Sequence, residues 1–97
     1  MKKLNEIREI LKQQKEFLKK KYKIKEIGIF GSYVRGEQTY TSDVDILVEF
    51  EEVPSLLKFV ELENYLSDVL GVKVDLVEKK ALKPRMGKHI LQEIVIL

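Results

Sequence analysis

The chain has 97 residues, of which 44% are hydrophobic and 35% charged, and its formal net charge is +2. This length corresponds to one small domain spanning residues 1–97. The absence of cysteine excludes disulfides and thiolate metal sites, and a lone histidine argues against zinc.

Positive charge is concentrated near the N-terminus, where residues 1–25 hold ten Lys or Arg against three Glu, a balance of +7. Such a segment either contacts nucleic acid or an acidic partner, or forms a solvated helix face, which is the commoner case. No apolar run approaches the roughly 20 residues of a membrane span, and glutamates interrupt the N-terminal "MKKLNEIREIL", unlike a signal peptide. We expect a cytoplasmic protein that binds no membrane and does not bind nucleic acid directly.

The apolar pattern alternates between helical and strand periods from the N-terminus onward. Helical spacing predicts a helix over about residues 3–22, and the β-branched "IKEIGIF" predicts a strand that ends at Gly31. Residues 32–36 follow as a short helical turn. The stretch "SDVDILVEFE" predicts a second strand.

A second long helix is predicted over "PSLLKFVELENYLSDVLG", which Pro54 and Ser55 begin and Gly71 ends. We expect its apolar face to consist of Leu56, Phe59, Val60, Leu66, Val69 and Leu70. "VKVDLVEK" predicts a third strand, and "GKHILQEIVIL" after Pro84 predicts a closing amphipathic helix. The order α-β-α-β-α-β-α indicates an α/β (α+β) fold, a small sheet with helices packed on it. The pattern alone leaves open whether neighbouring strands run parallel or antiparallel.

Asp43 and Asp45 stand within a strand that is otherwise made of core residues. Strand alternation puts both on one face, roughly 6.5–7 Å apart along the backbone. The opposite, core-facing row is Val44, Ile46, Val48 and Phe50. Because burying an unpaired carboxylate is costly, the two aspartates either face solvent or hold a cation.

Gly31 and Ser32 follow the first strand, where a glycine lets a ligand approach the backbone closely. A short helix starting at Ser32 would aim N–H groups at a ligand, which favours phosphate. Asp75 alternates with core residues of the third strand and would join Asp43 and Asp45 if that strand lies beside the second. Carboxylates near a phosphate site suggest Mg²⁺.

The combination of Gly-Ser, ten residues, Asp-x-Asp and a later strand aspartate resembles the nucleotidyltransferase superfamily that includes DNA polymerase beta. The stretch "FGSYVRGEQTYTSDVDILV" is most similar to its smallest members, the minimal nucleotidyltransferases, and the resemblance covers nearly the whole chain. It implies the nucleotidyltransferase fold with a small mixed β-sheet, ATP as substrate and two Mg²⁺ ions. Tyr33 stands where some members have arginine, which leaves a phosphate contact from that position open.

The resemblance also implies roles for individual residues. The nucleotide-binding residues would be Gly31, Ser32, Arg35 and Gly36, and the catalytic and metal-binding residues Asp43, Asp45 and Asp75. Asp75 would act as a metal ligand or as the base for the attacking hydroxyl. Arg35 is otherwise a surface arginine, and Tyr33 and Tyr40 either stack on a base or pack in the protein.

Small members of this family are commonly paired with a HEPN-domain protein, often as the antitoxin of a toxin–antitoxin module. Some inactivate the HEPN ribonuclease by transferring AMP to one of its tyrosines. The resemblance therefore implies a metal-dependent protein adenylyltransferase that moves AMP from ATP to a protein hydroxyl. A chain of this length has few residues left to bind a second substrate. We therefore expect the acceptor surface to come from a partner protein or from a second copy of the chain in a homo-oligomer. The alternative is a non-catalytic antitoxin that neutralises its partner by binding alone.

Overall fold

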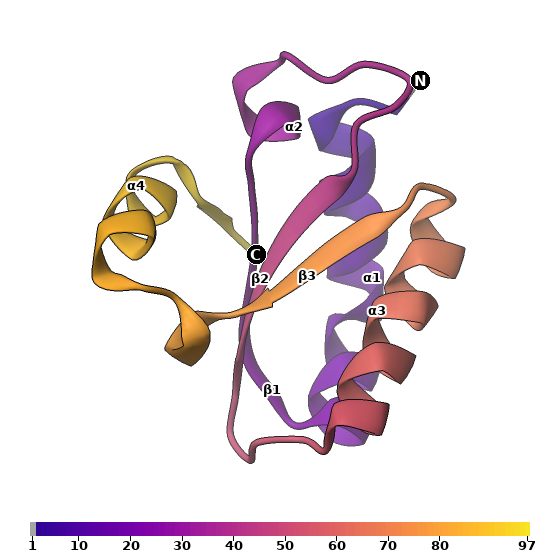
Figure 1. Cartoon of the computed structure of the whole chain (residues 1–97). Helices are drawn as coiled ribbons and strands as arrows, with labels where there is room; N and C mark the ends of the chain where they lie inside the picture. Colours follow the sequence, from indigo (N-terminus) through magenta and orange to yellow (C-terminus); the bar gives the residue numbers. More distant parts are fainter. Residues whose placement is uncertain (1) are drawn as a thin grey trace.

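The computed structural model describes residues 2–97, in which a four-stranded sheet carries two long helices on one face (Figure 1). The elements in chain order are α1 (Leu4–Tyr22), β1 (Ile24–Phe30), α2 (Ser32–Arg35), β2 (Val44–Phe50), α3 (Leu56–Leu70), β3 (Val74–Glu78), the 3-10 turn η1 (Lys79–Ala81), α4 (Pro84–Glu93) and β4 (Val95–Ile96). The predicted fold class, a small sheet with helices packed on it, is confirmed.

The strands lie in the order β3-β2-β1-β4. β1 runs antiparallel to both of its neighbours, whereas β2 and β3 run parallel, so the sheet is mixed, as the resemblance implied. This topology brings the end of β1 and the starts of β2 and β3 to one edge of the sheet. Whatever residues stand at these three strand ends are therefore neighbours in space.

The core lies between the sheet and the two long helices α1 and α3. The β2 residues predicted to face inward are buried there, namely Val44, Ile46, Val48 and Phe50, with Ile7, Leu11 and Leu18 from α1 and Leu62, Leu66 and Leu70 from α3. The predicted face of α3 is partly wrong, because Leu56 is 78% exposed and Val60 42% exposed. The i, i+4 stripe that starts at Leu62 faces the sheet, and Leu56 and Val60 fall off that stripe.

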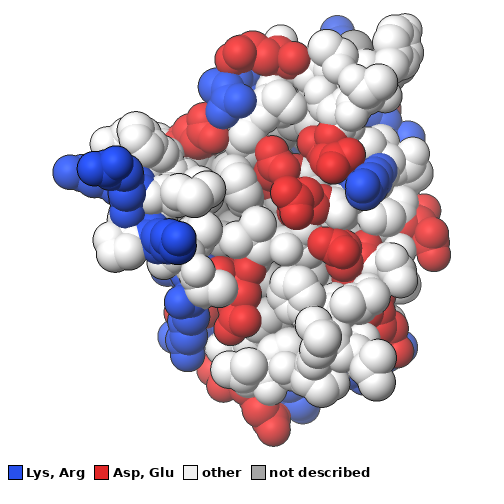
Figure 2. Space-filling view, viewed as in Figure 1, with Lys and Arg blue, Asp and Glu red and all other residues white. Residues whose placement is uncertain are grey.

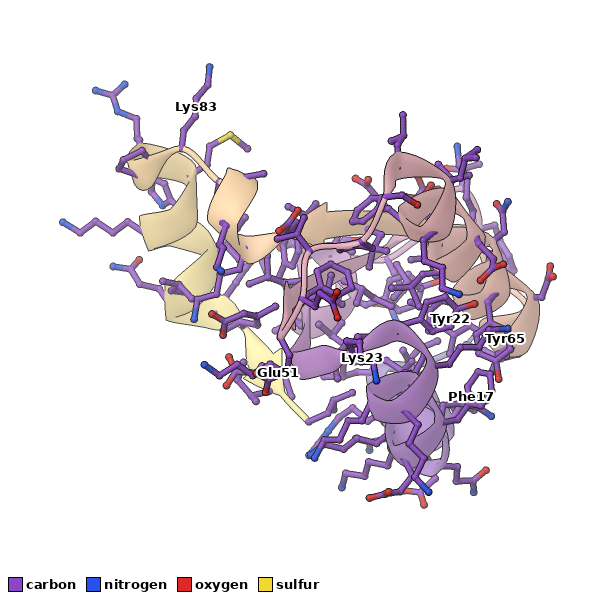
Figure 3. All side chains as sticks on the ribbon, turned by 90° about the horizontal axis from the view of Figure 1, so that it is seen from below. Phe17, Tyr22, Lys23, Glu51, Tyr65 and Lys83 are labelled. Carbon is purple, nitrogen blue, oxygen red and sulfur yellow. The ribbon has the colours of Figure 1, made fainter. Side chains whose placement is uncertain are left out.

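The end of the molecule far from α2 is closed by three aromatic rings, those of Phe17, Tyr22 and Tyr65 (Figure 3). The ring centroids of Phe17 and Tyr65 lie 5.1 Å apart. The Tyr22 hydroxyl donates a 2.8 Å hydrogen bond to Glu61, and burial together with this bond raises the pKa of Tyr22 to about 12. This cluster joins α1 to α3 and fixes the two helices under the sheet.

The C-terminal segment differs from the predicted helix over residues 87–97. The helix α4 begins at Pro84 and ends at Glu93, and the last residues pair with β1 as the short strand β4. The Leu97 amide also donates to the Ile27 carbonyl at 3.0 Å. The free edge of β1 offers backbone partners to a β-branched tail, and this pairing outweighs continuation of the helix. None of the helices described between residues 2 and 97 has the length and apolarity that crossing a membrane would require.

Candidate functional site

The candidate site lies at the edge of the sheet where β1 ends and β2 and β3 begin. Asp45 is its centre, because its Cα is the ladder partner of Phe30 on β1 and of Asp75 on β3. Gly31, directly after Phe30, therefore flanks Asp45 on one side and Asp75 flanks it on the other. Figure 2 shows acidic side chains gathered over this part of the surface.

The carboxyl group of Asp45 is half-buried among other negative charges. Burial, followed by the charges of Asp75 and Asp43, raises its pKa from 3.8 to about 6, although Arg35 opposes the shift. A carboxylate in this position is stabilised by any cation that approaches it. The site is thus a cluster of negative charges, in which Asp45 has a raised pKa because of burial and its acidic neighbours.

Asp43 lies outside the strand in which it was predicted, because β2 begins at Val44. The preceding residues form a tight turn instead, in which the Ser42 amide donates to the Thr39 carbonyl and the Thr39 amide to the Ser42 hydroxyl. These local bonds compete with strand pairing for the same backbone groups. Asp43 remains next to Asp45 at the mouth of a cavity of about 460 Å³, which it lines together with Tyr33, Tyr40 and Lys73.

Gly31 shapes the turn between β1 and α2. Its φ of +82° lies in the region that side chains other than glycine rarely adopt, and a Cβ at this position would collide with the Asp45 carboxylate. Gly36 also has a positive φ, +70°, but open space surrounds its Cα. The close approach of Gly31 to Asp45 therefore depends on the missing side chain, whereas Gly36 serves only the turn.

The first residues of α2 divide between the site and the core. Ser32, which is half-buried, follows Gly31 at the start of the turn. Tyr33 is only 3% exposed and belongs to the core, so its ring packs inside the protein. Tyr40 is 89% exposed. Of the two tyrosines that flank the site, only Tyr40 has a side chain that is exposed to solvent.

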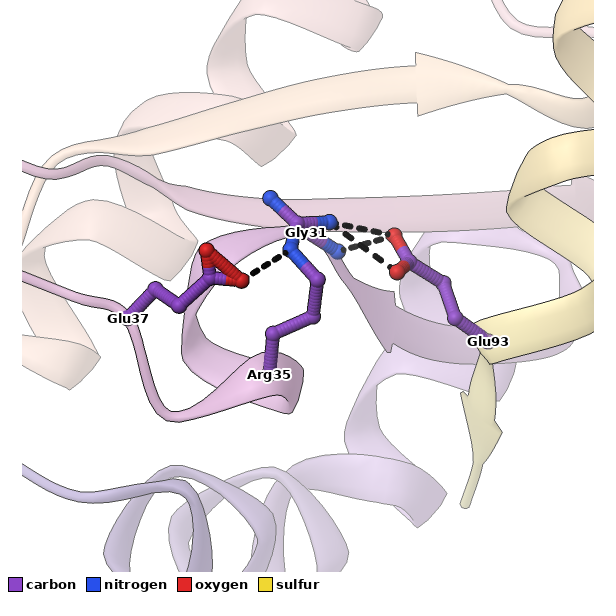
Figure 4. A network of polar contacts seen from close by, with 4 residues as sticks. All are labelled: Gly31, Arg35, Glu37 and Glu93. Carbon is purple, nitrogen blue, oxygen red and sulfur yellow. Dashed lines mark hydrogen bonds and ion pairs between the residues drawn. The ribbon is translucent and has the colours of Figure 1, made fainter.

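Arg35 is tied to two acidic side chains (Figure 4). Its Nη1 group donates to both carboxylate oxygens of Glu93, at 3.0 and 2.9 Å, and its Nε group donates to Glu37 at 2.9 Å. Burial opposes ionisation of Glu93, but the bonds from Arg35 and from the Gly31 amide outweigh it and lower the pKa of Glu93. Arg35 therefore lies beside the predicted phosphate site, and its contact with phosphate stays a prediction.

Asp75 is held from behind by helix α3. The amides on either side of it in β3 do not face β2: Val74 donates to the Ser67 hydroxyl and Leu76 to the Glu63 carboxylate, each at 2.9 Å. These two bonds fix the edge strand between the sheet and the helix. The exposed Asp75 side chain is thereby set in register with Asp45.

The carboxylate oxygens of the site are suitable donors for a hard cation, although they do not form a complete coordination sphere. Within residues 2–97, no group of three or more His, Cys, Asp or Glu is arranged closely enough to hold a metal ion. Carboxylate oxygens are nevertheless the donors that Mg²⁺ takes from proteins, where it also keeps waters and substrate phosphates as ligands. The raised pKa of Asp45 indicates negative charge that such an ion would neutralise. Asp43 and Asp45 are accordingly the groups that would hold it.

The sequence pattern did not predict three residues that surround the site, namely Glu93, Glu63 and Ser67. One feature of the sequence could have identified Glu93. A negative charge in the last turn of a helix is unfavourable because of the helix dipole, so it indicates that the side chain has a specific partner. It was hidden because the helix was predicted to run on to residue 97. Glu63 and Ser67 look like ordinary polar positions of an amphipathic helix.

Comparison with known proteins agrees with this geometry. Residues 11–97 match the family model described as the nucleotidyltransferase domain. The chain is 56% identical to the protein adenylyltransferase MntA of Thermococcus cleftensis over 92 residues, which cover 95% of this chain and 93% of the relative.

Two solved structures share the fold. One, described as a minimal nucleotidyltransferase, superposes with a TM-score of 0.76 at 33% identity and covers 94% of this chain and 95% of its own. The other, described as a toxin–antitoxin with AMP-PNP, has a TM-score of 0.71 at 26% identity and covers 95% of this chain and 69% of its own.

Proposed function

Because the chain belongs to the nucleotidyltransferase domain family, as one of its minimal members, we propose that it transfers AMP from ATP to a hydroxyl group of a partner protein. We further propose that the acceptor is a tyrosine of a HEPN-type toxin, for which this chain, a single domain, serves as antitoxin in the cytoplasm. The observation that carries the proposal is the contact of Gly31 with the Asp45 carboxylate, with Asp75 in register on the other side.

In this proposal the Gly31–Ser32 turn receives the triphosphate. The Gly31 backbone lies against the Asp45 carboxylate, so a phosphate bound to this turn would stay close to Asp45, and the Ser32 hydroxyl donates a hydrogen bond to a phosphate oxygen. Gly36 allows the chain to leave α2 sharply, so that the turn stays open toward the sheet edge. The exposed Tyr40 is placed to contact the nucleotide or the acceptor.

Asp43 and Asp45 would hold Mg²⁺, which in two-metal sites neutralises the phosphates and stabilises the attacking and leaving oxygens of an in-line displacement. The acceptor hydroxyl oxygen forms a bond to the α-phosphorus of ATP, and the bond from that phosphorus to the bridging oxygen of the β-phosphate breaks. Pyrophosphate leaves with the bond's electron pair. Asp75 takes the proton of the hydroxyl, which it reaches because its side chain is exposed beside Asp45.

Two facts support a protein as the acceptor. The relative at 56% identity is named a protein adenylyltransferase, and a solved neighbour of the same fold is a toxin–antitoxin with an ATP analogue. In addition, the carboxylates lie at an open sheet edge rather than in a closed pocket, so a second macromolecule has access to them.

The experiment incubates the purified chain with a candidate HEPN-type partner protein, ATP and Mg²⁺, and then measures the intact mass of the partner. We expect an adduct of the mass of AMP, which disappears in Asp43→Asn and Asp45→Asn and persists in the surface control Asp68→Asn. An unchanged partner mass in a tight complex would instead establish the non-catalytic antitoxin. Circular dichroism of each variant confirms that the fold is retained.

A further inference from the structure

Glu93, the last residue of α4, reaches across to the turn that follows β1. One of its carboxylate oxygens accepts a 2.9 Å hydrogen bond from the Gly31 amide, and both oxygens accept from Arg35 (Figure 4). Gly31 immediately precedes the short α2 segment, and Arg35 is its last residue. A single carboxylate from a distant part of the chain therefore joins both ends of this turn.

The backbone of Glu93 is itself fixed to the sheet. Directly after it, β4 pairs with β1, where Ile96 and Val95 are the partners of Gly28 and Ile29. The Ile94 side chain fills the space beside Gly28, since a Cβ there would stand 2.7 Å from its terminal carbon. Glu93 is thus held in place by the strand that also leads into Gly31, and it cannot drift away from the turn as a loop residue would.

This position is electrostatically unfavourable without its partners. Glu93 lies at the negative end of a helix and adds its charge to the field around Asp45. The charge-assisted bonds from Arg35 and the amide bond from Gly31 offset that cost. A glutamate that contacted only solvent at this helix end would not stabilise the protein. The bonds to Gly31 and Arg35 therefore explain why a glutamate stands at this position.

We propose that Glu93 is a positioning residue for nucleotide transfer, which orients the Gly31 peptide and the Arg35 guanidinium so that the α2 turn receives phosphate. The inference rests on the proposed function, because it assigns Glu93 to the same site. Glu93 uses the Gly31 amide and the Nη1 group of Arg35. Among residues 2–97 no hydrogen bond occupies the Nη2 group of Arg35, so this donor is directed by Glu93 and left for phosphate.

The test compares Glu93→Ala with the control Glu37→Gln, because both acidic residues pair with Arg35 but only Glu93 also holds Gly31. We expect Glu93→Ala to raise both KM for ATP and the ATP dissociation constant, measured without partner, by roughly tenfold, as loss of a charge-assisted bond implies, with a smaller effect on kcat. Glu37→Gln should change neither by more than about twofold. Protection of the Gly31 amide against hydrogen exchange should fall in Glu93→Ala alone.

The variant Glu93→Gln keeps an acceptor for Gly31 and removes only the charge, so it is expected to fold and to show an intermediate loss of ATP affinity. If both Glu93 variants bind ATP as tightly as the wild type, Glu93 has only a structural role in holding α4, and the proposal is overturned. Tighter ATP binding by Glu93→Ala would also overturn it, since the carboxylate would then compete with phosphate. If the wild type binds ATP but modifies no partner, the proposed acceptor is wrong while the role of Glu93 is still decided by ATP affinity and Gly31 exchange.

Discussion

Asp45 and Asp75 are Cα partners on the parallel strands β2 and β3, so two carboxylates stand side by side at the centre of the site. Their mutual repulsion is part of what raises the pKa of Asp45 to about 6. The same repulsion makes the stability of the protein depend on pH and on cations. The first two predictions measure this dependence.

Without metal, we expect the contribution of Asp45 to the free energy of unfolding to fall as pH rises from about 4 to about 6. The folded protein holds the Asp45 proton more tightly than the unfolded chain, whose pKa is near 3.8. The stabilisation is thus fully present below pH 3.8 and lost as pH rises through 6. After allowance for solvent screening it is on the order of 1 kcal/mol. Urea unfolding in EDTA across this range measures it, and Asp45→Asn should flatten the profile; equal slopes in both proteins would contradict the assignment.

Asp75→Asn should raise the melting temperature in EDTA, because one of the repelling charges is removed. The same variant should gain less stability from Mg²⁺ and ATP than the wild type, since ligands stabilise the folded state in proportion to their affinity. Thermal melts in EDTA and with Mg²⁺ and ATP test both expectations by comparing the melting temperature of Asp75→Asn with that of the wild type. Asp68→Asn, on the exposed side of α3, is the control and should behave as the wild type. A lower melting temperature of Asp75→Asn in EDTA would mark Asp75 as a structural hydrogen-bond acceptor.

Gly31→Ala and Gly36→Ala form a matched pair, because both glycines have a positive φ but only Gly31 touches Asp45. Gly36→Ala should cost about 1 kcal/mol of stability, from the backbone conformation alone. Gly31→Ala should cost about 2 kcal/mol or more, and should abolish AMP transfer, because the added methyl group displaces the Asp45 carboxylate. Chemical denaturation and the transfer assay report the two effects. Similar losses in both variants would show that the contact with Asp45 is unimportant.

Ser67→Ala should reduce AMP transfer although Ser67 lies on the far side of β3. Its hydroxyl accepts from the Val74 amide, next to Asp75, and removing this acceptor should cost about 1–2 kcal/mol. Ser55→Ala is the control, because Ser55 caps the start of α3 through the Lys58 amide and should cost about 1 kcal/mol. The free energy of unfolding should fall in both variants. The rate of AMP transfer at saturating ATP should fall only in Ser67→Ala. A transfer rate that falls equally in both would assign the effect to general stability.

Much of the fold and the centre of the site could be predicted because they depend on local patterns. Alternation along β2 correctly put Val44 and Ile46 in the core and Asp45 on the other face. The Gly-Ser turn after a strand and the later strand aspartate identified the sheet edge. The pattern left open that β2 and β3 are parallel neighbours, which sets Asp45 beside Asp75; the resemblance implied only a mixed sheet in which Asp75 completes the site.

What escaped prediction depends on contacts between distant parts of the chain. Glu93 meets Gly31 across 62 positions of sequence, and only the pairing of β4 with β1 brings them together. The end of α4 was misplaced for the same reason, since the helical pattern of the tail gives no sign that β1 has a free edge. The burial of Leu62 in place of Leu56 likewise depends on how α3 is rotated against the sheet.

The hydrogen bonds that Ser67 and Glu63 accept also occupy two amides on the outer edge of β3. Unpaired amides along a border strand invite a foreign strand to extend the sheet, which leads to aggregation or to swapped assemblies. Here the Val74 and Leu76 amides are already occupied, and the opposite border is the two-residue β4. A strand added beside β3 would find these two amides already bonded. We therefore expect a partner to dock through side chains, across the end of the sheet where Asp45 lies.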